Sequence, residues 1–241
     1  MRADGFCPYF EESGVEVLHF QEVWTRRALA ALRARLPSYP FVAWRRGIAG
    51  QPAGGLATFS RLPLGAVSYT SFRGAWPDRG GLRFRVVRAV NSALQGVLAV
   101  ELAGLATVVA NTHLTANKDG DWSAGNRHLG FQRTQVARLQ AALGRAGTDL
   151  VVVAGDFNIA SDGPLYPLLV DGWRDPFAAT DPVTYHAAFL PPGASGHRID
   201  YLLVRGGRVI HSGLLFAGPD GRGRYLSDHV ALTATVQRSF G

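Results

Sequence analysis

Residues 149–158, read DLVVVAGDFN, constrain the fold of this chain more than any other stretch. The apolar run is short, β-branched and uninterrupted, which is typical of a strand buried on both faces of a sheet. Asp156 and Asn158 follow at its carboxyl end, and alternate residues of an extended chain point the same way. Such a pair is suited to presenting oxygens to a hard cation or a phosphate. Because Gly, Asp and Asn are also common in the turn after a strand, this stretch alone leaves both interpretations open.

Further short apolar runs recur along the chain and predict a fold rich in β-structure. The expected strands are residues 14–20, 39–44, 55–60, 96–102, 105–112, 185–190, 198–204, 208–216 and 229–236. Two of these, residues 96–102 and 105–112, flank Ala103-Gly104 and are expected to form a hairpin. Segments rich in Gly, Pro and Asp predict loops, chiefly at residues 71–82, 115–125 and 161–192.

Two segments have the spacing of apolar residues that is expected of helices. Thr25 caps the first of them and Pro37 stops it. The second covers residues 132–143, and Gly144 provides its end. Neither a linker nor a repeat divides the sequence. Many strands with few helices between them predict α/β layers in one domain over residues 1–241.

Composition and charge narrow the class of protein. With 241 residues, 47% of them hydrophobic and 18% charged, the chain has the composition of a globular protein rather than a disordered one. The formal net charge is +7, and Lys118 is the only lysine, so nearly all the positive charge is arginine. Arginine binds phosphate in a bidentate manner, which favours an anionic substrate or surface. The arginines are scattered, however, so a coding bias remains the other interpretation, and no basic run marks a nucleic-acid tail.

Several classes of protein are excluded or disfavoured. Cys7 is the only cysteine, which excludes a disulfide within the chain and a zinc site built from several cysteines. The longest apolar stretch, residues 97–110, is too short to span a bilayer, so no transmembrane segment is expected. Arg2 is followed by Asp4 and not by an apolar signal-peptide region. As written the chain is expected in the cytoplasm, and secretion stays open if its amino terminus is incomplete.

Carboxylate, amide and imidazole side chains lie at the ends of several of the expected strands or in the loops beside them. They are Glu22, Asn111 with His113, Asp156 with Asn158, Asp200 beside Arg198, and Asp228 with His229. A single histidine or carboxylate near a strand end is usually structural. Five such groups in one chain indicate a common site.

These groups belong to five ordered motifs that resemble the endonuclease/exonuclease/phosphatase superfamily, the DNase I-like metal-dependent phosphoesterases. The motifs are Gln21-Glu22-Val23, Asn111-Thr112-His113-Leu114, Gly155-Asp156-Phe157-Asn158, Arg198-Ile199-Asp200-Tyr201 and Ser227-Asp228-His229. They cover most of the chain, which makes a chance match improbable. The resemblance implies a four-layer α/β/β/α sandwich, in which the strand ends meet in one cleft.

The resemblance also implies catalytic and phosphate-binding roles. His229 matches the catalytic histidine and Asp200 the carboxylate that holds it. Asp156 and Asn158 match the pair that orients the attacking water and contacts the scissile phosphate. The groups on the phosphate side are matched by Asn111 and His113. A carboxylate paired with His229 would raise the pKa of its imidazole and fix its tautomer, but whether His229 acts as a base or as a cation is left open.

A divalent metal is the implied cofactor. Glu22 matches the metal-binding glutamate of the superfamily, and Asp228 matches a further acidic residue near the metal. Oxygen ligands favour Mg²⁺ or Mn²⁺ over zinc. A phosphodiester is anionic and repels hydroxide, so a cation has to neutralise its non-bridging oxygens while water is activated.

One family element has no counterpart in the sequence. Family members begin with a strand that ends in a metal-binding asparagine ahead of the glutamate motif, whereas residues 1–12 contain no apolar strand. Its loss is expected to expose neighbouring strand edges and to remove one metal ligand. A start internal to a longer reading frame is the preferred explanation. A degenerate member with impaired metal binding is the alternative.

The substrate class is a finer prediction. Residues 96–116, with Arg127 and Gln132 beyond them, look most like the sphingomyelinase-type branch, which are phospholipases C, although Gln95 stands where a lysine is usual. A phospholipid headgroup is therefore the preferred phosphodiester substrate. The alternatives are a non-specific endonuclease or exonuclease acting on nucleic acid, which the basic charge supports, and a catalytically impaired phosphate-binding domain. Trp76, Trp122 and residues 189–192 fall in expected loops, where a minority interpretation is peripheral membrane contact. The protein is expected to be a monomer.

Overall fold

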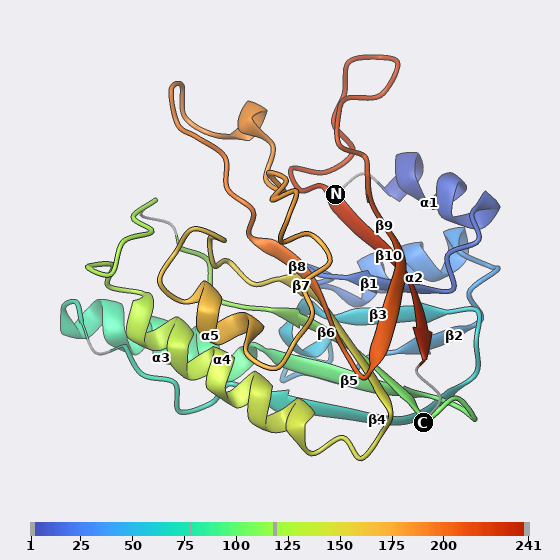
Figure 1. Cartoon of the computed structure of the whole chain (residues 1–241), viewed down its shortest axis with the longest axis horizontal. Coiled ribbons are helices and arrows are strands. Elements are labelled where there is room, and N and C mark those ends of the chain that lie inside the picture. Colours follow the sequence, from blue (N-terminus) through green and yellow to red (C-terminus); the bar gives the residue numbers. More distant parts are fainter. Residues whose placement is uncertain (1–2, 78, 118–119, 239–241) are drawn as a thin grey trace.

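The computed structural model describes residues 3–77, 79–117 and 120–238 and is built around a five-stranded sheet (Figure 1). Its strands, in spatial order, are β4 (Leu64–Ser71), β5 (Gly96–Leu102), β6 (Thr107–His113), β7 (Leu150–Asp156) and β8 (Asp200–Arg205). Strands β6 and β7 are parallel, and the other neighbours are antiparallel. The expected hairpin of β5 and β6 is confirmed.

Two smaller sheets pack against one face of this sheet. The first has the order β1 (Val17–Phe20), β3 (Ala57–Ser60), β2 (Phe41–Ala43), and the second consists of β9 (Gly207–Leu215) and β10 (Ala231–Arg238). Leu98 and Val100 of β5 are buried in one cluster with Ala43 of β2 and with Leu56, which directly precedes β3. Residues of β7 and β8 make the corresponding core with the second. The inner faces of the sheets thus share an apolar interior.

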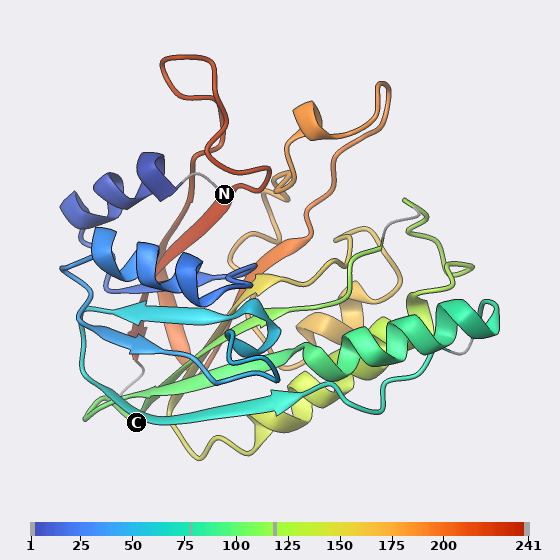
Figure 2. The same ribbon diagram turned by 180° about the vertical axis from the view of Figure 1, so that it is seen from behind.

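Helices form the two outer layers. They are α1 (Ala3–Glu12), α2 (Arg26–Arg35), α3 (Leu82–Leu94), α4 (Leu129–Gly144) and α5 (Tyr166–Val170), with short 3-10 helices at η1 (Ala53–Gly55) and η2 (Ala187–Phe189). Figures 1 and 2 show α1 and α2 on one side of the sheets and α3 to α5 on the other. This arrangement confirms the predicted four-layer α/β/β/α sandwich. Among the residues described, none of the helices has the length and apolar character that a bilayer crossing requires.

Features of the local sequence explain where α2 begins and why β7 is buried. Thr25 caps α2, since its hydroxyl oxygen accepts a hydrogen bond from the backbone N–H of Ala28 at 3.0 Å. Strand β7 is buried on both sides as expected, because Val151 and Val153 face the helices while Val152 and Ala154 face β9 and β10.

Some elements differ from the expectation. Residues 185–190 are not a strand: Tyr185 makes one isolated bridge to His229, and η2 follows. The segments expected as loops at residues 71–82 and 161–192 also contain the start of α3 and the short helix α5. The sequence patterns predict neither helix α1 nor strand β4. In β4, residues that face solvent interrupt the apolar alternation, which hides the strand in the sequence.

The two smaller sheets are not hydrogen-bonded to each other. Within the described residues, β1 pairs only with β3, and β10 pairs only with β9. Aromatic side chains of α1 pack beside these sheets, where the Phe6 ring lies 5.7 Å from that of Phe20 and the Tyr9 ring 5.3 Å from that of Phe216. An amphipathic helix therefore covers the region around β1, and no strand of residues 3–16 extends the sheet.

Candidate active site

Strand register brings three of the predicted residues to one edge of the large sheet. His113, the last residue of β6, pairs with Asp156, the last residue of β7. Asp156 in turn pairs with Asp200, the first residue of β8. Residues that are directly opposite in neighbouring strands project to the same face. Residues far apart in the sequence therefore converge because three strand ends coincide.

His229 joins this group from the sheet of β9 and β10. It lies two residues before the start of β10 at Ala231. Its Nδ1 lies 2.9 Å from Asp200 Oδ2, and its Nε2 lies 3.9 Å from Asp156 Oδ2. On the other side of Asp156, the Nε2 of His113 lies 3.5 Å from the same Oδ2. The carboxylate of Asp156 is thus flanked by two imidazoles, one of which is held by a second carboxylate.

Burial and charge shift the proton affinities of these groups. Burial alone would lower the pKa of His229, but the carboxylates of Asp200 and Asp156 outweigh it and raise the pKa above its ordinary value. Burial, and then the negative charge of Asp200, raise the pKa of Asp156. Burial lowers the pKa of His113, which favours the neutral imidazole. Two imidazoles with opposite pKa shifts thus flank Asp156, whose own pKa is raised.

Asn158 shapes the turn that follows β7. Its φ is +51°, its backbone N–H donates to Asp156 Oδ1 at 2.9 Å, and its Nδ2 donates to the carbonyl of Leu114 at 3.1 Å. The side chain of Gln132 donates to its carbonyl. The sequence left open whether Asn158 is a turn residue or a residue of the site. It adopts the left-handed conformation that favours Asn in turns, and it also lies beside the carboxyl group of Asp156.

Asn111 lies between the sheets. Its side chain is fully buried, and its Nδ2 donates to the carbonyls of Phe20 at 3.0 Å and Ala57 at 3.1 Å. Its Oδ1 accepts from Gln21 Nε2 at 2.7 Å. The amide therefore ties β6 to β1 and β3, next to the Gln21-Glu22 motif. Its predicted contact with a phosphate stays a prediction.

The two predicted metal residues lie at the periphery of the cluster. Glu22 is exposed and has a φ of +59°, and its charge raises the pKa of His113 against the larger effect of burial. Asp228 is also exposed and precedes His229 directly. Within the described part of the chain, the compact set of potential ligand atoms is instead that of Asp156, Asp200 and His229, which lie within 4.8 Å of one another.

The donor set fits a hard divalent cation. Two carboxylates, Asp156 and Asp200, lie close together at this edge of the sheet, and burial together with the charge of Asp200 raises the pKa of Asp156. A bound divalent ion would relieve that repulsion. Asp156 and Asp200 each accept one hydrogen bond, from Asn158 and from His229, and each keeps a second carboxylate oxygen.

Comparison with known proteins assigns the family. The model of the Endonuclease/Exonuclease/phosphatase family matches residues 2–229. The chain belongs to this family. Members of the Endonuclease/Exonuclease/phosphatase family are hydrolytic phosphoesterases, and they generally use divalent metals. The comparison with curated proteins gave no match.

Solved structures agree with the Endonuclease/Exonuclease/phosphatase fold. D. rerio TDP2, humanized by 14 mutations, is 18% identical to this chain, with a TM-score of 0.72. D. rerio TDP2 complexed with single strand DNA product is 16% identical, also with a TM-score of 0.72. Each alignment covers 98% of this chain and 91% of the other. Sphingomyelinase C from Streptomyces griseocarneus is 17% identical with a TM-score of 0.63, covering 96% of this chain and 91% of the other. At these identities the similarity demonstrates the fold alone.

Two aromatic residues outside the predicted set flank the Endonuclease/Exonuclease/phosphatase family site. The ring of Tyr185 meets that of His229 edge to face at 4.9 Å. Burial and surrounding negative charges raise the pKa of its hydroxyl. Trp24 is exposed, and its ring lies 6.3 Å from that of His113. Trp24 follows the Gln21-Glu22-Val23 motif directly and is the one residue that proximity in sequence could have suggested.

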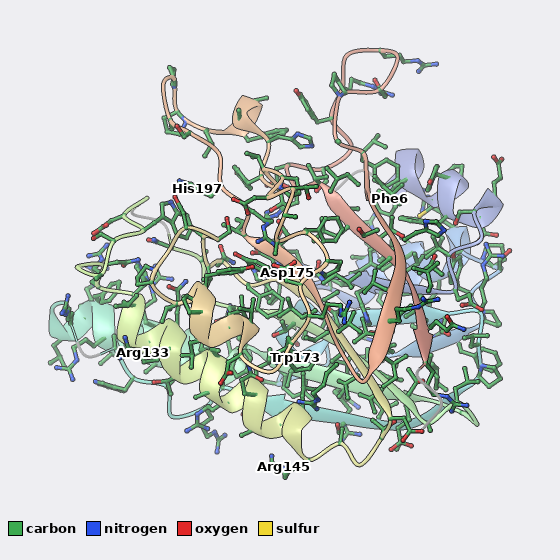
Figure 3. All side chains as sticks on the ribbon, in the orientation of Figure 1. Phe6, Arg133, Arg145, Trp173, Asp175 and His197 are labelled. Carbon is green, nitrogen blue, oxygen red and sulfur yellow. The ribbon has the colours of Figure 1, made fainter. Side chains whose placement is uncertain are left out.

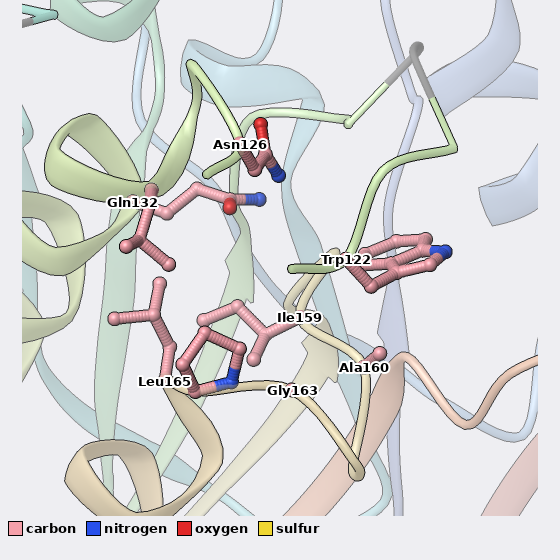
Figure 4. Close-up of a pocket in the computed structure, with 9 residues that line it drawn as sticks. Trp122, Asn126, Gln132, Ile159, Ala160, Gly163 and Leu165 are labelled. Carbon is pink, nitrogen blue, oxygen red and sulfur yellow. The ribbon is translucent and has the colours of Figure 1, made fainter. Parts of the chain in front are cut away.

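A small hollow lies next to the segment that follows Asn158. Gln132, Trp122 and Ile159 are among the residues that line it (Figure 4). The Trp122 ring lies 5.1 Å from that of His197, which is labelled above the sheets in Figure 3. Trp122, for which the sequence leaves membrane contact open, thus packs partly against its own protein.

Proposed function

We propose that this chain is a divalent-metal-dependent phosphodiesterase, formed by one domain over residues 1–241. The observation that carries the proposal is the convergence of His113, Asp156, Asp200 and His229 at one edge of the sheet. Asp200 accepts a hydrogen bond from Nδ1 of His229 and fixes the orientation of the ring, so that Nε2 is directed toward Asp156. A charged His229 is suited to contact an anionic phosphoryl oxygen or to protonate a leaving oxygen.

The remaining predicted residues complete the proposed site. Asp156 and Asn158 orient water at the phosphate, and His113 and Asn111 act on the phosphate side, with Asn111 also fixing the Gln21-Glu22 segment. Glu22 and Asp228, together with the oxygens of Asp156, would hold Mg²⁺ or Mn²⁺. When bound, the ion would neutralise the non-bridging oxygens of the diester.

The preferred substrate is a phospholipid headgroup diester, hydrolysed as in a sphingomyelinase-type phospholipase C. The motif pattern from residue 96 to Gln132 supports this preference. Gln95, which replaces the usual lysine, accepts a hydrogen bond from the Thr115 hydroxyl at 2.5 Å and so joins the segment after His113 without contributing charge.

A nucleic acid is the second candidate substrate. The formal net charge of +7 supports it, as does the similarity to a TDP2 structure that was complexed with single strand DNA product. A third candidate is a phosphate-binding domain with impaired catalysis. It is supported by the strand pairing, since within the described residues β1 pairs only with β3 and no strand precedes β1 to supply the expected metal-binding asparagine.

A side-by-side assay separates the three candidates. Purified protein is offered sphingomyelin vesicles and plasmid DNA, each with Mg²⁺, with Mn²⁺ and with EDTA. We expect metal-dependent release of phosphocholine. Nicking of the plasmid without phosphocholine release would replace the lipid preference by the nuclease, and inorganic phosphate binding without hydrolysis of either substrate would favour the impaired domain.

A further inference from the structure

Helix α3 turns a row of apolar side chains toward solvent. Leu82, Val86, Val87, Val90 and Leu94, here called the α3 stripe, are between 41% and 73% exposed. Four of them are spaced by four residues, so they lie along one face of the helix. Figure 2 shows α3 at the surface, at one end of the molecule.

Contacts on the opposite face fix this orientation. The Phe84 ring packs against His128 at 5.1 Å, and Arg85 Nε donates to the carbonyl of Pro77 at 2.9 Å. Ser92 is fully buried, and its hydroxyl donates to the carbonyl of Phe72 at 3.1 Å. The helix thus directs Phe84, Arg85 and Ser92 inward and the apolar α3 stripe outward, whereas an amphipathic helix usually buries its apolar face. A contiguous exposed apolar surface of this kind is typical of an interaction site.

Exposed arginines accompany the α3 stripe at its amino-terminal end. Residues 79–95 contain no aspartate or glutamate. Arg79 precedes the helix and Arg83 follows Leu82 within it, and both are exposed. These two residues are here called the arginine rim. Trp76, in the preceding loop, adds an exposed aromatic ring. The surface therefore combines aliphatic side chains with positive charge.

The carboxyl end of α3 is connected to the edge that carries the active site. Gln95 follows α3 directly and accepts from the Thr115 hydroxyl, two residues after His113. Strand β5 then begins, and its Val97 pairs with Thr112. The carboxyl end of α3 therefore lies near the strand ends that carry His113, although the helix covers the other face of the sheet.

We infer that the α3 stripe and its arginine rim dock the protein on an anionic lipid surface. Aliphatic side chains enter the boundary of the acyl chains, and guanidinium groups remain among the lipid headgroups. A nucleic acid would contact the arginines but leave the valines in water. A second copy of the chain would bring two positive rims together. The inference does not require that a lipid is the substrate.

Vesicle sedimentation tests the inference. Protein in EDTA, which prevents hydrolysis, is mixed with phosphatidylcholine vesicles that either contain or lack phosphatidylglycerol. We expect binding that requires the anionic lipid. Val86→Asp with Val90→Asp should reduce the bound fraction at limiting lipid by about tenfold or more, and Arg83→Gln by a few-fold, since one basic residue contributes about 1 kcal/mol.

Controls keep the result independent of folding and of catalysis. Ile210→Asp removes an exposed apolar side chain on β9 and should leave vesicle binding unchanged. Because the α3 stripe is exposed, the double variant should melt near the wild-type temperature, and Val86→Ser with Val90→Ser provides a milder replacement. Absence of wild-type binding, or equal binding by the stripe variants, would overturn the inference. A concentration-dependent dimer in light scattering that the stripe variants abolish would replace the lipid by a second copy.

Discussion

Replacing Arg198 by methionine should strongly destabilise the segment that carries Asp200. The Arg198 side chain is buried, its Nη1 lies 2.6 Å from Asp175 Oδ2, and its Nε lies 2.7 Å from Asp181 Oδ1. Its guanidinium also lies 4.7 Å from the centre of the Tyr201 ring. These contacts anchor the chain two residues before Asp200, beside the active site.

The magnitude follows from the two ion pairs. The Asp175 side chain is 3% exposed, so without Arg198 its carboxylate would remain buried and unpaired, which costs about 3 to 5 kcal/mol. The Asp181 side chain is 52% exposed, and its pair contributes less than about 1 kcal/mol. We therefore expect Arg198→Met to lower the free energy of unfolding by about 3 to 5 kcal/mol.

Urea unfolding followed by tryptophan fluorescence measures this loss, and a double-mutant cycle isolates the pair. Asp175→Asn in the Arg198→Met background should restore part of the stability, with a coupling energy of about 2 kcal/mol or more. Asp181→Asn is the matched control and should change little. A loss below about 1 kcal/mol in Arg198→Met, or strictly additive single effects, would refute the reasoning.

Three further changes test other parts of the structure. Burial lowers the pKa of His19 to about 4 from an ordinary 6.5, so its contribution to stability is complete above pH 6.5 and is lost as the pH falls toward 4. Relative to His19→Gln, the wild type should lose about 3 kcal/mol across that window, measured by urea unfolding at each pH. Gly155 has a φ of +150°, and a Cβ there would lie 2.0 Å from the Thr112 carbonyl, so Gly155→Ala should destabilise the protein by about 2 to 4 kcal/mol in urea unfolding. The Thr184 hydroxyl accepts hydrogen bonds from the N–H groups of Ile199 and Asp200, both at 3.0 Å. Thr184→Val should therefore lower the rate of diester hydrolysis and reduce the free energy of unfolding in urea by about 2 kcal/mol. Thr184→Ser should retain the hydrolysis rate and the stability.

Each of these changes has a matched control. His211 is exposed on β9, and His211→Gln should keep the wild-type dependence of stability on pH. A Cβ on Gly144, at the end of α4, would meet no atom within 4 Å, so Gly144→Ala should alter stability by less than about 1 kcal/mol. The serine variant keeps the hydroxyl group, whereas the valine variant keeps only the shape of the side chain. If both variants are equally impaired, the two hydrogen bonds to the Thr184 hydroxyl are not the cause.

The strand ends of the site could be predicted because local patterns determine them. An uninterrupted β-branched run defines β7, and Asp156 and Asn158 follow it directly. Their position beside His113 and Asp200 depends on the strand register, which no local pattern contains. The order of the five motifs supplied that long-range information, because it resembles that of a family with a known fold.

Other features depend on contacts that a sequence pattern does not reveal. The amide of Asn111 is typical of a phosphate-binding group, yet its bonds to Phe20 and Ala57 span 91 and 54 residues of sequence. Helix α3 was missed although Leu82, Val86, Val90 and Leu94 have helical spacing, so its existence could have been predicted; the exposure of this apolar face could not. Residues 185–190 have strand-like composition, but within them only Tyr185 pairs, in an isolated bridge to His229.

Steady-state hydrolysis of a soluble phosphodiester is the most direct test of the proposed function. Wild-type protein is compared with Asp156→Ala and His229→Ala in Mg²⁺ and in EDTA, and His211→Ala, on exposed β9, serves as the control. We predict hydrolysis that requires the metal, that His211→Ala retains, and that each active-site variant lowers by about a hundredfold or more. Equal rates in the wild type, the active-site variants and EDTA would contradict the assignment of these strand ends as a catalytic site.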